Sequence, residues 1–74
     1  MQYTKLQLAE LLRKTQKFIG QKGFDNDKQV IAEVIEVYEE NGDILIKLMR
    51  EDDGEVNVNI KYFNENIRDN LLRV

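Results

Sequence analysis

Two acidic clusters are the parts of the chain whose residue types and spacing could bind a metal ion or transfer protons. They are Asp25-Asn26-Asp27 and Asp52-Asp53-Gly54-Glu55. Carboxylates at alternate positions are typical of the start of a calcium-binding loop, but such a loop requires glycine at its sixth position, which is Val30 here. Aspartate also favours turns, because its carboxylate accepts hydrogen bonds from the nearby backbone. We therefore expect both clusters to form turns and no metal ion to bind.

The residue types that are missing restrict catalysis further. The sequence contains no Ser, Cys, His, Pro or Trp. Without Ser or Cys it lacks the usual nucleophiles, and without His it lacks a side chain that titrates near neutral pH. Without Cys it can form no disulfide and no zinc or redox motif. We expect a protein that is not an enzyme and that uses neither a cofactor nor a small-molecule substrate.

The length and composition are those of one small folded domain, 1–74. The 74 residues are 42% hydrophobic and 34% charged, which is typical of a globular chain. No run of apolar residues is long enough to span a membrane. Small secreted domains usually carry disulfides, so a chain without cysteine is expected in the cytoplasm.

The N-terminal segment is predicted to be a helix over residues 5–19. Thr4 and Gln7 have the spacing of a capping box, in which each side chain accepts a hydrogen bond from the other residue's backbone N–H. Gly20 is placed to end the helix. One side of the helix is apolar, which indicates that it packs on a core. That side holds Leu8, Leu11, Leu12, Thr15, Phe18 and Ile19.

The middle segment, residues 29–39, is predicted to be a strand. Its apolar residues would also suit one side of a helix, but most are β-branched, and Asn41-Gly42 follows as a strong hairpin signal. A two-residue loop at this position aligns the two strands. The expected pairs are Glu40 with Asp43, Glu36 with Lys47, and Glu33 with Arg50.

A second hairpin is predicted at Asp52-Asp53-Gly54, with Gly54 in the left-handed conformation. It would place Val58 opposite Leu48 and Ile60 opposite Ile46. The side chains expected to face the core are Ile31, Ile35, Val37, Ile44, Ile46, Leu48, Val56, Val58 and Ile60.

The expected fold class is α+β, an N-terminal α-helix packed on a three- to four-stranded antiparallel β-meander with a short C-terminal helix or strand. The tail allows a short helix capped by Asn64, or a strand over residues 71–74. The alternative fold is a small SH3-like or Sm-like barrel with an N-terminal helix. Residues 38–46 and 67–69 resemble parts of the Sm-like signature, but the Asn and Gly of that signature are Asp43 and Asp69 here.

The face of the sheet opposite the helix is the predicted binding site. Apolar residues on a face expected to meet solvent indicate contact with a partner. These are Ala32, Val34, Tyr38, Leu45 and Met49, around the pair Glu36 and Lys47. The partner would be another protein or a second copy of the chain, contacted by Val34, Glu36, Tyr38, Leu45, Lys47 and Met49. Alternatively the tail covers this face through Phe63, Ile67 and Leu71.

The charge distribution leaves a second function open. Residues 1–24 carry a net charge of +4 and residues 25–59 a net charge of −8. Arg13, Lys14 and Lys17 on the helix could contact phosphates, which makes a nucleic-acid-associated regulator the alternative. The expected function is a small non-catalytic interaction module, an adaptor or an inhibitor. It is similar in type to the anti-host or anti-defence proteins of phages and mobile elements.

Overall fold

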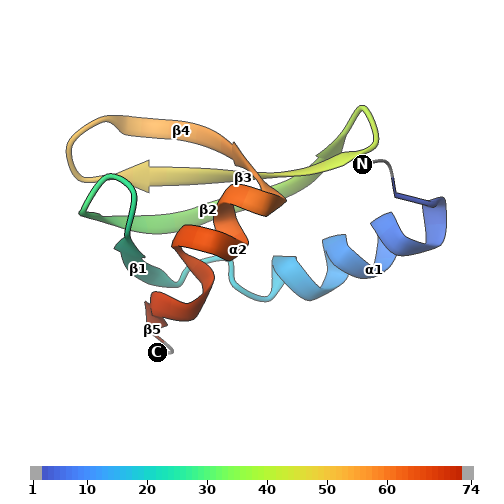
Figure 1. Cartoon of the computed structure of the whole chain (residues 1–74), viewed down its shortest axis with the longest axis horizontal. Helices are drawn as coiled ribbons and strands as arrows, with labels where there is room; N and C mark the ends of the chain where they lie inside the picture. The colour runs from blue at the N-terminus through green and yellow to red at the C-terminus, as the bar shows by residue number, and fades with distance from the viewer. Residues whose placement is uncertain (1–2, 73–74) are drawn as a thin grey trace.

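Residues 3–72 are described by the computed structural model, and they form an antiparallel sheet with two α-helices on one face (Figure 1). The elements in order are α1 (Lys5–Gln16), β1 (Lys22–Asp25), β2 (Val30–Glu40), β3 (Asp43–Arg50), β4 (Gly54–Asn59), α2 (Ile60–Asn66), the short 3-10 helix η1 (Arg68–Asn70) and β5 (Leu71–Leu72). The strand order is β4-β3-β2-β1-β5. The α+β meander is confirmed. The barrel alternative is wrong, because the two end strands do not pair and the sheet is open.

Helix α1 begins at the predicted residue and ends earlier than predicted. The Thr4 side chain accepts a hydrogen bond from Gln7 N, and the Gln7 side chain accepts one from Thr4 N, so the capping box is confirmed. The helix ends at Gln16, not at Ile19. Residues 17–20 form a turn, in which Gly20, at φ +92°, donates its N–H to the Val34 carbonyl at 2.8 Å.

Strand β1 was not predicted, and it joins the tail to the sheet. It pairs antiparallel with β2 on one side and with β5 on the other, where Gly23 lies opposite Leu71. A Cβ atom on Gly23 would lie 2.9 Å from the Asn70 carbonyl oxygen. Only glycine therefore allows β5 to approach this closely.

A β-bulge in β2 exchanges the two faces of that strand. The pairs Glu40–Asp43 and Glu36–Lys47 are confirmed, but the pairing shifts between Val34 and Glu36. Glu33 therefore lies opposite Met49, and its predicted pairing with Arg50 is wrong. Because Ile35 is an extra residue, the alternation of side chains is displaced by one on its N-terminal side.

Because of the bulge, four residues lie on the side of the sheet opposite to the predicted one. Ala32 and Val34, expected on the outer face, are 0% exposed. Ile31 and Ile35, expected in the core, are 37% and 36% exposed. The predictions for these four positions are wrong, and the bulge is the physical reason.

The second hairpin has a loop one residue earlier than predicted. Residues 51–53 form the turn, and Gly54 follows with φ +77°. Leu48 then pairs with Val56 and Ile46 with Val58. The partners differ from the predicted ones by two residues, so the same side chains still face the core. Ile60 is buried as predicted, but it begins helix α2.

The tail folds under the same face of the sheet as α1. Helix α2 is capped by Asn59 and not by Asn64, because the Asn59 carboxamide accepts the Tyr62 N–H at 2.8 Å. Phe63 and Ile67 are 0% and 1% exposed in the core, so the alternative in which the tail covers the opposite face is wrong. Residues 73–74 of the predicted last strand lie outside the described residues. The core consists of Ala32, Val34, Val37, Ile44, Ile46, Leu48, Ile60, Phe63 and Ile67.

Candidate functional site

The side of the sheet turned away from both helices is the first candidate site, and we call it the outer face. Neither described α-helix packs on it (Figure 1), because α1 and α2 contribute to the core on the other side. The pairing register assigns fourteen side chains of β1 to β4 to this face. They are Lys22, Phe24, Ile31, Glu33, Glu36, Tyr38, Glu40, Asp43, Leu45, Lys47, Met49, Glu55, Asn57 and Asn59.

Five of the six predicted partner-binding residues lie on the outer face. Tyr38 lies opposite Leu45 and both are half-buried. Lys47 Nζ lies 3.6 Å from Glu36 Oε1 in the neighbouring pair, and Met49 is 39% exposed. Val34 is the exception, because it belongs to the core and cannot contact a partner.

The most exposed apolar residues of this face form a group at its β1 end, which we call the apolar patch. It consists of Phe24, Ile31 and Met49, which are 41%, 37% and 39% exposed. Phe24 lies directly opposite Ile31 in the register. Met49 lies opposite Glu33, two residues from Ile31, which is within reach of a long side chain. The patch therefore crosses three adjacent strands.

Two members of the apolar patch were not predicted from the sequence. Phe24 was missed because β1 was not predicted, and Ile31 because the bulge was not. One signal for the bulge is present in the sequence: Val34 and Ile35 are consecutive apolar residues, which interrupts the alternation of a half-buried strand.

The charged residues of the outer face are mostly acidic. Glu33, Glu36 and Glu55 belong to it, and so does the pair Glu40–Asp43 at the hairpin end, next to the pair Tyr38–Leu45. The basic residues of this face are Lys22 and Lys47. Acidic side chains therefore outnumber basic ones on the face that carries the apolar patch.

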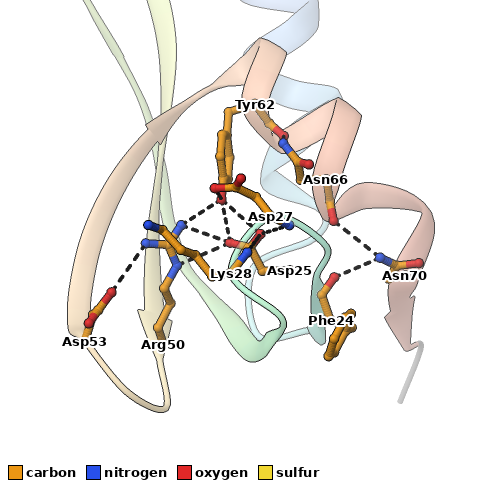
Figure 2. Close-up of polar contacts among 9 residues, drawn as sticks. All are labelled: Phe24, Asp25, Asp27, Lys28, Arg50, Asp53, Tyr62, Asn66 and Asn70. Carbon is orange, nitrogen blue, oxygen red and sulfur yellow. Dashed lines mark hydrogen bonds and ion pairs between the residues drawn. The ribbon is translucent and has the colours of Figure 1, made fainter.

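The second candidate site is a polar cluster that joins β1, β3 and α2 (Figure 2). The Arg50 guanidinium donates to Asp25 Oδ2 through Nε at 3.2 Å and through Nη2 at 2.9 Å. Their side chains are 6% and 0% exposed, so this is a buried ion pair. Tyr62 Oη lies 2.9 Å from both Asp25 carboxylate oxygens and 3.0 Å from Asp27 Oδ2.

The environment of this cluster keeps each group in one protonation state. Burial raises the pKa of Asp25, but hydrogen bonds from Tyr62, Arg50 and the backbone of Lys28 and Asp27 outweigh it and hold the pKa below 3.8. Burial and the hydrogen bonds to Asp25 and Asp27 raise the pKa of the Tyr62 hydroxyl. Burial lowers the pKa of Arg50, but the hydrogen bonds and electrostatic interactions with Asp25 and Tyr62 together outweigh this effect, so the pKa of Arg50 is raised overall.

These pKa shifts make the cluster unsuited to acid–base catalysis. Asp25 stays ionised and Tyr62 stays protonated at neutral pH, so neither exchanges a proton easily. The cluster instead holds three elements together. Asp25 also accepts the N–H groups of Asp27 at 3.0 Å and Lys28 at 3.3 Å, which forms the turn between β1 and β2. That turn was predicted, whereas the ion pair was not.

The two acidic clusters of the sequence lie at the turns 26–29 and 51–53. Among residues 3–72, no group of three or more His, Cys, Asp or Glu side chains is arranged to hold a metal ion. Asp53 lies 3.9 Å from Arg50 Nη1 at the edge of the buried cluster.

The basic residues of α1 form a third candidate surface. Arg13, Lys14 and Lys17 are all exposed, and they lie near the C-terminal end of the helix. The ion pairs found within residues 3–72 involve none of the three. Lys17 Nζ lies 5.7 Å from the centroid of the Phe18 ring.

Comparison of the chain with protein-family models, with curated proteins and with solved structures found no match. Within the described part of the chain, no helix has the length and apolar character needed to cross a membrane.

Proposed function

We propose that this chain is a small non-catalytic interaction module of the cytoplasm that binds a partner protein through the outer face of its sheet. The observation that carries the proposal is the apolar patch, in which Phe24, Ile31 and Met49 adjoin one another without cover from a described helix. Large apolar side chains that gather on one face mark interaction sites more often than scattered ones do. An adaptor or an inhibitor, including the anti-host or anti-defence type encoded by phages and mobile elements, would act in this way.

The charges of the outer face indicate the chemistry of the partner. Acidic residues outnumber basic ones on this face, so a complementary surface has an apolar centre and a border of Lys and Arg. Tyr38 and Leu45 extend the contact surface toward the hairpin end. The Glu36–Lys47 pair between them would fix the orientation of the partner more than it adds affinity.

The proposal is tested by comparing charged variants of two exposed surfaces. The double variant is Ile31→Lys/Met49→Lys. Both wild-type side chains are more than one third exposed, so we expect the substitutions to leave the core intact. Truncating an interface anchor costs about 2 kcal/mol or more, and we expect the partner to bind at least roughly thirtyfold more weakly. Proteins retained by the immobilised wild-type chain are identified, purified and titrated against each variant by calorimetry.

Leu6→Lys is the matched control. Leu6 is 72% exposed on α1, so the substitution makes the same chemical change on a different surface. The proposal requires that the control binds the captured protein as the wild type does. Equal affinity of wild type and double variant for every captured protein contradicts it.

Nucleic-acid binding is the second candidate, supported by the exposure of Arg13, Lys14 and Lys17 without ion-pair partners in the described chain. If these residues contact phosphates, the logarithm of the association constant falls linearly with the logarithm of the salt concentration, with a slope near −0.9 per contact on duplex DNA. An apolar interface changes little with salt. A titration with duplex DNA and with single-stranded RNA over a salt series separates the two functions.

A further inference from the structure

The free edge of β4 is a surface that the proposed partner face does not use. Strand β4 is the end of the sheet on the side opposite β5. Figure 1 shows no described element beyond it, and its main packing partners are β3 and α2. An end strand leaves half of its backbone N–H and C=O groups without a strand partner.

The pairing of β2 with β3 determines which backbone groups those are. The tight turn at Asn41-Gly42 closes with the hydrogen-bonded pair Glu40–Asp43, and bonded pairs alternate from there along an antiparallel ladder. Odd-numbered residues of β3 therefore direct their backbone groups toward β2. The bond from the next odd residue, Glu51 N–H to the Ile31 carbonyl at 3.2 Å, follows the same rule.

Even-numbered residues of β3 direct their backbone groups toward β4, where they meet Gly54, Val56 and Val58. The backbone groups of Glu55 and Asn57 consequently point away from the sheet. Outside the ladder with β3, the turn, loop and cap hydrogen bonds between backbone groups of residues 3–72 involve none of residues 54–58.

The edge of β4 lacks the features that normally prevent strand pairing. Edge strands are usually protected by proline, by a bulge or by several charges. Within β4 the charged residue is Glu55, and the sequence contains no proline. The ladder with β3 runs from Gly54 to Asn59 without a register shift.

We propose that β4 pairs antiparallel with β4 of a second copy of this chain, about a two-fold axis that passes by Asn57. This register sets Asn57 opposite Asn57 of the partner subunit and Glu55 opposite Asn59 of the partner subunit. The backbone groups of Glu55 and Asn57 then bond to the same kind of groups in the other copy. A register centred on Glu55 is disfavoured, because it would place two carboxylates opposite each other.

The side chains support the same register. Val56 and Val58 are half-buried on the inner face of the sheet. In the proposed pairing Val56 lies opposite Val58 of the partner subunit, so the apolar inner layer continues across the axis. A strand with this alternation is complementary to itself, which favours a second copy over an unrelated extended peptide. The result is one continuous sheet with the helices of both copies on the same side.

The test uses two variants at one position. Asn57→Pro removes an N–H that points to the partner, while the ladder with β3 keeps its bonds. Asn57→Ala keeps the N–H and is the matched control, because both variants also remove the 3.0 Å hydrogen bond from Tyr38 Oη to Asn57 Oδ1. The molar mass is measured by sedimentation equilibrium from micromolar to millimolar concentration, and the fold is checked by circular dichroism.

We expect the wild type and Asn57→Ala to approach twice the 8.8 kDa chain mass at high concentration and Asn57→Pro to remain at the chain mass. A wild type that stays monomeric throughout overturns the proposal, and so does a proline variant that still dimerises. If the proline variant does not fold, the pairing is tested instead by hydrogen exchange of the wild-type backbone amides at several protein concentrations. Exchange of Glu55 and Asn57 that slows with concentration supports the pairing, and exchange independent of concentration overturns it. The double variant Ile31→Lys/Met49→Lys changes the outer face and not the edge of β4, so it should still form this dimer. A failure of the dimer proposal can therefore be told apart from a failure of the proposed partner binding.

Discussion

Replacing Arg50 by methionine should destabilise the fold strongly, because it leaves a buried carboxylate without its cation. Asp25 is 0% exposed and would retain only the Tyr62 hydroxyl and two backbone N–H groups. Breaking a buried pair by removing one partner costs about 3–5 kcal/mol. A domain of 74 residues has a free energy of unfolding of roughly 4–11 kcal/mol, so the loss is a large part of the total.

The cost of Arg50→Met should depend on pH in a defined direction. In the wild type the pKa of Asp25 lies below its unfolded value of 3.8, so its ionisation stabilises the fold above that pH. This stability is lost as the pH falls through the lowered pKa. Without Arg50 the pKa of Asp25 rises, because burial is no longer outweighed to the same extent. The difference between wild type and variant therefore shrinks as the pH falls below neutrality.

Urea unfolding followed by circular dichroism at several pH values measures both effects. Arg68→Met is the control, because Arg68 is 51% exposed and lies 3.8 Å from Asp69 in a surface pair. The control should stay within roughly 0.5 kcal/mol of the wild type. The double variant Asp25→Asn/Arg50→Met should be more stable than Arg50→Met alone, because the buried charge is gone. An Arg50→Met chain within about 1 kcal/mol of the wild type at neutral pH would refute the reasoning.

Two further predictions concern Tyr62 and the bulge. Because the pKa of Tyr62 is raised above its unfolded value of 10.0, the protonated hydroxyl stabilises the fold fully below pH 10.0 and progressively less at higher pH. Tyr62→Phe should therefore show a smaller fall of the urea midpoint at alkaline pH than the wild type. Equal falls in both proteins contradict this role. Ala32→Leu should cost about 1–3 kcal/mol through overpacking of a residue that is 0% exposed, whereas Ile31→Leu should stay within about 0.5 kcal/mol. The reverse order of the two unfolding free energies would show that β2 has no bulge.

Local signals in the sequence predicted the fold well. Thr4 and Gln7 form their capping box because the interaction spans a single helical turn. Asn41 and Gly42 adopt φ of 53° and 80° and close the predicted hairpin, because these residue types tolerate the left-handed conformation.

Features that depend on distant parts of the chain were not predictable from those signals. Strand β1 is short and is held between β2 and β5, which lie on either side of it in space. The Arg50–Asp25 pair joins residues 25 positions apart, and the bulge in β2 turns Val30 and its partner Asp25 to the inner side, where Arg50 lies. The same bulge moved Ile31 to the outer face and Val34 to the core, which explains why the candidate site was predicted only in part.

Chemical-shift mapping is the measurement that tests outer-face binding most directly. The isotope-labelled chain is titrated with the protein captured by the wild type, and the perturbed backbone amides are assigned. We expect the largest shifts at Phe24, Ile31 and Met49, with smaller ones toward Tyr38. Shifts confined to α1 around Arg13, with none on the outer face, would contradict the proposed function.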